Sequence, residues 1–64
     1  MKEESLKIYN EGKEAIKKKH AFKVVTEFGI KVFEPGSSIY STRFLRNMLI
    51  VLERLGEDAV AIRD

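Results

Sequence analysis

The segment from Ser41 to Leu55, closed by Gly56, constrains the fold most, because its apolar spacing, start signal and stop signal all agree. At about 100° per residue, its apolar side chains fall within one stripe roughly 120° wide. Serine is a typical helix N-cap, and glycine readily takes the left-handed conformation that closes a helix. The segment therefore predicts an amphipathic helix that contacts a core through Phe44, Leu45, Met48, Val51, Leu52 and Leu55.

The N-terminal stretch predicts another helix, over residues 3–19, with a glycine inside it. Its apolar residues recur at helical spacing, but Gly12 costs about 1 kcal/mol against alanine in a helix interior. Either another element approaches Gly12 closely, or Asn10-Glu11-Gly12 is a turn between two short strands. The helix is the favoured interpretation. Its apolar face carries Leu6, Tyr9, Gly12 and Ile16, with Ile8 and Ala15 to one side.

Residues 21–34 change to a period of two, which predicts a β-hairpin. Glu27-Phe28-Gly29 fits a three-residue loop that ends in a left-handed glycine. That register pairs Thr26 with Ile30, Val24 with Val32 and Phe22 with Glu34. It predicts a core face of Phe22, Val24, Thr26, Ile30 and Val32, and an opposite face of Lys23, Val25, Lys31 and Phe33.

After Gly56, the alternation of Val60 and Ile62 with smaller or charged residues predicts a short third strand. The order helix, strand, strand, helix, strand indicates a single small α+β domain over residues 1–64, with a hairpin-based sheet and both helices packed on one face. A chain of this size buries only about 60% of its unfolded surface, so its core is thin. Without disulfides, such a domain gains stability by pairing with another chain.

The composition argues against most kinds of catalytic or metal site. The chain has no cysteine and a single histidine, His20, so it predicts neither a metal site nor a cofactor. No glycine-rich phosphate loop and no nucleophile–base pair is present, and we expect a non-enzymatic protein. A subunit of a larger enzyme is a further alternative, because a shared site leaves little trace in one chain. The absence of a signal peptide and of a long apolar run predicts a cytoplasmic protein that does not span a membrane.

The leading functional hypothesis is an interaction module that acts through protein–protein contact and self-associates, most simply as a homodimer. Val25 and Phe33 are predicted on the back of the hairpin, and Ile50 on the outward face of the Ser41–Leu55 helix. Together they leave more apolar surface than a 64-residue monomer easily hides. Val25, Phe33 and Ile50 are therefore the candidate interface residues.

The alternative hypothesis is a nucleic-acid-binding regulator of the same fold. Residues 13–23 hold five lysines and one glutamate, although the whole chain has a net charge of only +2. Lysines at a helix C-terminus are usually solvated and favour the helix dipole, but a continuous basic surface could contact phosphates. Its candidate residues are Lys17, Lys18, Lys19, Lys23, Arg43 and Arg46.

Residues Thr26–Phe33, TEFGIKVF, resemble the hairpin of swapped-hairpin transition-state regulators. In that family an acidic pair and a glycine precede a basic and apolar strand and a proline. This chain has Ile30 where those proteins carry a basic residue, and its proline is displaced to Pro35. We therefore transfer no site residue from the resemblance.

Overall fold

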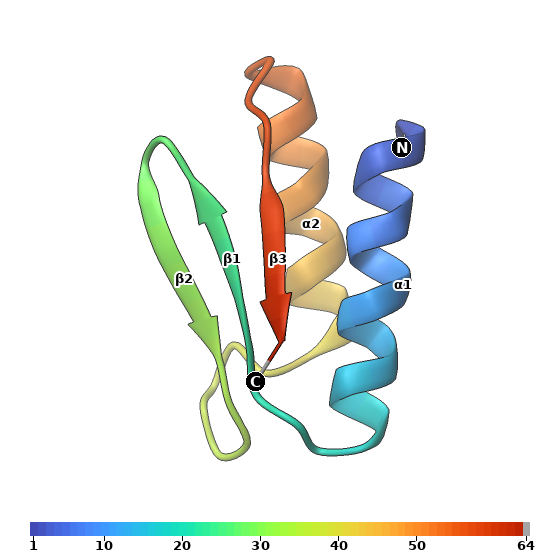
Figure 1. Ribbon diagram of the computed structural model, residues 1–64, viewed down its shortest axis with the longest axis vertical. Coiled ribbons are helices and arrows are strands. Elements are labelled where there is room, and N and C mark those ends of the chain that lie inside the picture. The colour runs from blue at the N-terminus through green and yellow to red at the C-terminus, as the bar shows by residue number, and fades with distance from the viewer. Residues whose placement is uncertain (64) are drawn as a thin grey trace.

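The computed structural model describes residues 1–63, which form two helices and one antiparallel sheet (Figure 1). The sheet has the strand order β2-β1-β3, so β1 is central and the other two strands are edges. Both helices pack on one face of the sheet, which confirms the predicted α+β fold. In chain order the elements are α1 (Glu3–Lys17), β1 (Phe22–Thr26), β2 (Gly29–Phe33), α2 (Thr42–Arg54) and β3 (Val60–Arg63).

The core lies between the sheet and the two helices. Its members come from α1, from the inner sides of β1 and β2, and from α2. They are Ile8, Ala15, Phe22, Val24, Phe33, Leu45, Leu49 and Leu52. Among the described residues no polar or charged side chain is buried, so the hydrophobic effect and packing provide the specificity of this core.

The first helix is continuous, and the alternative turn at Asn10-Glu11-Gly12 is wrong. Gly12 is buried where α1 crosses α2. A Cβ atom placed on Gly12 overlaps the Leu45 Cδ2 methyl group and lies 3.1 Å from the Phe22 ring. Close approach of another element therefore explains this glycine.

The predicted start and stop signals of α2 are both confirmed. The Ser41 hydroxyl accepts a hydrogen bond from the Phe44 amide at 3.1 Å. Gly56 has a φ of +70°, and the next amide, that of Glu57, donates to the Leu52 carbonyl at 2.9 Å. These are the contacts of a serine N-cap and of a Schellman motif.

The core-facing side of α2 is turned from the predicted stripe by roughly 60°. Leu49, which the stripe left out, is fully buried, whereas Val51 and Leu55 are 52% and 63% exposed. Met48 is partly buried. The apolar stripe of α2 is wider than the side of the helix that is buried. Part of the stripe therefore lies on the flank of the helix and does not contact the core.

The predicted hairpin register is wrong by one residue. Thr26 pairs with Gly29 and Phe22 with Phe33, so the loop contains only Glu27 and Phe28. Gly29 still has a positive φ, +126°, but it is the first residue of β2. A shift of one residue turns every side chain of β2 to the other face of the sheet.

Phe33 is consequently a core residue, and its predicted place on the outer face is corrected. Its ring stacks on Phe22 with centroids 4.7 Å apart and meets Phe44 edge-on at 5.9 Å. Ile30 and Val32, predicted in the core, are 62% and 41% exposed. The period-two pattern favoured burial of the side of the strand with two aliphatic residues over the side with one aromatic residue. The aromatic residue, however, buries more apolar area and stacks on a partner in the neighbouring strand.

The Gly12→Ala substitution tests the contact between the two helices. Alanine is the better helix former by about 1 kcal/mol, but overpacking a filled core costs about 1–3 kcal/mol. We expect a net loss of about 1 kcal/mol in the free energy of unfolding, measured by urea denaturation. The exposed Asn10→Ala on α1 is the control and leaves stability unchanged or higher. A Gly12→Ala protein more stable than the parent contradicts the close contact.

The rotation of α2 is tested by two neighbouring alanine substitutions. Leu49→Ala is expected to cost about 2–5 kcal/mol, because it opens a cavity in the core. Met48→Ala removes a partly exposed side chain and is expected to cost less than half as much. Equal losses in urea denaturation, or a larger loss for Met48→Ala, would return the core side of α2 to the predicted stripe.

Candidate functional site

The outer face of the sheet, away from the helices, is a grid of mostly β-branched side chains. Extended strands alternate their side chains, so the two observed registers decide which residues share this face. Across the sheet, Val32, Lys23 and Ile62 form one row. The neighbouring row consists of Ile30, Val25 and Val60.

Four apolar side chains of this outer sheet face are exposed. Ile30 and Val60 are 62% and 61% exposed, and Ile62 and Val32 are 48% and 41% exposed. These four side chains present on the order of 400 Å² of apolar surface, comparable with the largest patches that monomers show. The helices lie on the opposite side of the sheet (Figure 1), and nothing else in residues 1–63 covers this face.

The three candidate interface residues lie in three different places. Val25 is partly buried at the centre of the outer sheet face. Ile50 is partly exposed on α2, on the other side of the sheet, and Phe33 is in the core. The structure therefore assembles a surface around Val25 alone, and the prediction missed Ile30, Val32, Val60 and Ile62 as its neighbours.

The candidate basic residues divide into two groups. Lys17, Lys18 and Lys19 are exposed at the end of α1, and Arg43 and Arg46 are exposed at the beginning of α2. Both segments lie at the same end of the molecule, in the helix layer (Figure 1). Lys23 points instead from the outer sheet face, between Val32 and Ile62.

Tyr40 holds the two basic segments of the helix layer together. Its hydroxyl donates to the His20 carbonyl at 2.7 Å and lies 3.2 Å from the Ala15 carbonyl. Tyr40 immediately precedes the N-cap of α2, and Ala15 lies in the last turns of α1. The end of α1 is thus adjacent to the beginning of α2.

An acidic residue lies beside the lysines at the end of α1. The Lys18 ammonium lies 3.2 Å from the Glu14 carboxylate, one helical turn before it. The hydrogen bond and the charge of Lys18 hold the pKa of the Glu14 carboxyl below its usual value. Both side chains are exposed, so the pair contributes little to stability, but it partly neutralises the basic surface.

The described part of the chain contains no group of three or more acidic, histidine or cysteine side chains placed to hold a metal ion. Within residues 1–63, neither helix has the length and apolar character needed to cross a membrane. The exposed apolar side chains of the outer sheet face make it the leading candidate for a functional surface, and the basic end of the helix layer is the second.

Comparisons with protein-family models, with curated proteins and with solved structures found no match to this chain.

Proposed function

We propose that this protein is an interaction module that self-associates, and that a second copy of the chain covers the outer sheet face. The observation that carries the proposal is the grid of five β-branched residues, four of them exposed, with a single charge among them. Their side chains are stiff, so they lose little rotamer entropy when a partner covers them. A surface of this kind is suited to face-to-face packing.

A second copy suits the shape of this surface. Two sheets pack face to face at a separation of about 10 Å, with side chains from both inner faces interdigitated. In a two-fold dimer the same patch serves both partners, so an apolar grid meets an apolar grid. The small domain also gains buried area that its own core cannot provide.

Lys23 limits how the two copies can be oriented. It occupies one end of the grid, in the row with Val32 and Ile62. When the strands of the two copies run in opposite directions, the row with Lys23 in one copy faces the row with Val25 in the other. The two ammonium groups then lie apart, and each can reach solvent along its aliphatic stem.

The expected interface is small. Burying about 500 Å² on each copy gives roughly 1,000 Å² in total, at the lower end of specific protein interfaces. We therefore expect a dissociation constant in the micromolar range rather than an obligate dimer. Association should be visible at protein concentrations of roughly 10–100 μM.

The self-association is tested by placing a lysine at an exposed position of the outer sheet face. Ile30→Lys leaves the core untouched and is expected to shift the species to a monomer, because a charge at the interface must lose its hydration. Light scattering on a sizing column gives the mass. Val51→Lys is the matched control, since Val51 is similarly exposed but lies on α2, and it should keep the mass of the parent protein.

A parent protein that is monomeric across this concentration range contradicts the proposal. Equal masses for the parent protein and Ile30→Lys also contradict it, because they remove the outer sheet face from the contact.

Nucleic-acid binding is the second candidate function. The hydrogen bond from the Tyr40 hydroxyl to the His20 carbonyl favours it, because it holds the end of α1, with its lysines, beside the first turn of α2. The same column experiment distinguishes it when a mixed-sequence DNA duplex is added at about 50 and 200 mM salt. A complex that forms at low salt, disappears at high salt and is lost in Lys17→Glu would support phosphate contacts. A dimer indifferent to DNA would support the interaction module.

A further inference from the structure

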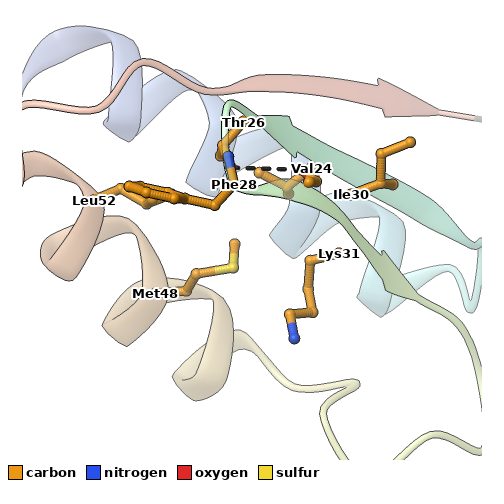
Figure 2. Close-up of a pocket in the computed structure, with 8 residues that line it drawn as sticks. Val24, Thr26, Phe28, Ile30, Lys31, Met48 and Leu52 are labelled. Carbon is orange, nitrogen blue, oxygen red and sulfur yellow. Dashed lines mark hydrogen bonds between the residues drawn. The ribbon is translucent and has the colours of Figure 1, made fainter.

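A groove lies on the helix side of the sheet, between the hairpin and α2. The two helices are displaced toward β3, and α1 contacts β3 but leaves β2 uncovered (Figure 1). The resulting hollow measures about 290 Å³. In Figure 2, Phe28 extends from the hairpin tip toward α2, Met48 points up from α2, and Lys31 extends from β2.

The groove continues along α2. A neighbouring hollow of about 360 Å³ is lined by Phe44, Asn47, Met48, Val51 and Leu52. It shares Met48 and Leu52 with the first hollow, so the two are one depression along the flank of the helix. This flank is the part of the apolar stripe of α2 that the core does not use.

Hydrogen bonds hold the hairpin tip in place above the groove. The Glu27 amide donates to the Glu57 carboxylate at 2.9 Å, which ties the tip to the segment between α2 and β3. The Phe28 amide donates to the Thr26 hydroxyl at 3.1 Å. Phe28 nevertheless remains 73% exposed, so its ring is available for contact.

The groove is lined by apolar and uncharged side chains with a single exception. Among the described residues that line the two hollows, Lys31 alone is charged. Lys31 is exposed and forms no ion pair within residues 1–63. An occupant that fits this groove is apolar along its length and carries a carboxylate near Lys31.

We infer that this groove binds an amphipathic helix of a partner protein, with apolar side chains at helical spacing and an acidic residue facing Lys31. A third helix would cover β2 and complete the helix layer over the sheet, in the helix-in-groove mode of recognition. A strand added to the edge of β2 would not contact the flank of α2. The groove lies across the sheet from the outer sheet face, so the inference does not depend on self-association.

A second copy of this chain has no suitable helix to offer. The large apolar side chains exposed on α1 are limited to Leu6, at 45% exposure. On α2 the large apolar side chain that is exposed is Val51, and it lines the groove itself. We therefore place a helix of a partner protein, rather than of a second copy, in the groove.

The probe for this inference is a displayed library of helical peptides of about 15 residues, randomised on one face and selected against the parent protein. We expect the enriched peptides to share apolar residues at spacings of three and four together with an aspartate or glutamate. Fluorescence anisotropy then measures the affinity of a selected peptide for each variant.

Two exposed positions in the groove and one outside it form the matched set. Phe28→Ser and Val51→Lys should each weaken binding about tenfold. Ile62→Lys, on the outer sheet face and outside both hollows, should leave the affinity unchanged. Lys31→Glu should weaken binding of the acidic peptide, and a peptide with lysine in place of its acid should recover the affinity. That recovery separates a direct charge contact from a general disturbance of the fold.

Three results would overturn the inference. The first is that no helical sequence is enriched, and the second is equal affinity of the selected peptide for the parent protein, Phe28→Ser and Val51→Lys. The third is a parent protein that dimerises while Val51→Lys is monomeric, which would assign the groove to a second copy.

Discussion

The stacking of Phe33 on Phe22 decides which side of β2 faces the helices, and most features of the surface follow from it. With the rings 4.7 Å apart and both residues buried, the hairpin register is fixed at the end of the strand pair, far from the loop. The one-residue shift then places Ile30 and Val32 on the outer sheet face and Lys31 on the helix side. One aromatic pair thus creates an apolar outer face and gives the groove its positive charge.

The second constraint is the contact between the helices at Gly12. Because this residue has no side chain, Leu45 of α2 can approach α1 closely enough to fill the space where a Cβ atom would be. The helix pair is correspondingly compact and lies toward β3 (Figure 1). The same arrangement leaves residues 29–32 of β2 exposed, so the compactness of the core and the groove have a common origin.

The sequence was sufficient to predict the element order and the ends of α2, because those signals are local. Ser41 and Gly56 act within one turn of the helix, and the chain order of helices and strands leaves few arrangements for so short a domain. The side of each element that is buried was harder to predict. Leu49 and Phe33 are buried through contacts with distant segments, and neither periodicity nor parity records how large a side chain is or what packs against it.

The candidate site was likewise predicted where the signal is local and missed where it depends on long-range contacts. Val25 was placed on the outer side of the hairpin because its parity does not depend on the register of β2, and that placement agrees with the structure. Val60 and Ile62 join it only because β3 pairs with β1, a long-range contact that the alternation of one strand cannot reveal. Lys23 was grouped with the helix lysines because they are close in sequence, but it projects from the outer sheet face, in the row with Val32 and Ile62.

The hairpin register buries Phe33, and we propose that a second copy covers the outer sheet face. One measurement tests both of them, an isotope-filtered nuclear Overhauser spectrum of a sample that mixes labelled and unlabelled copies. It should show contacts between the rings of Phe22 and Phe33 within one chain, and contacts between copies only for the methyl groups of the outer sheet face. Contacts between copies that involve the Phe33 ring would contradict its place in the core. No contact between copies at concentrations above the expected dissociation constant would contradict the proposed dimer.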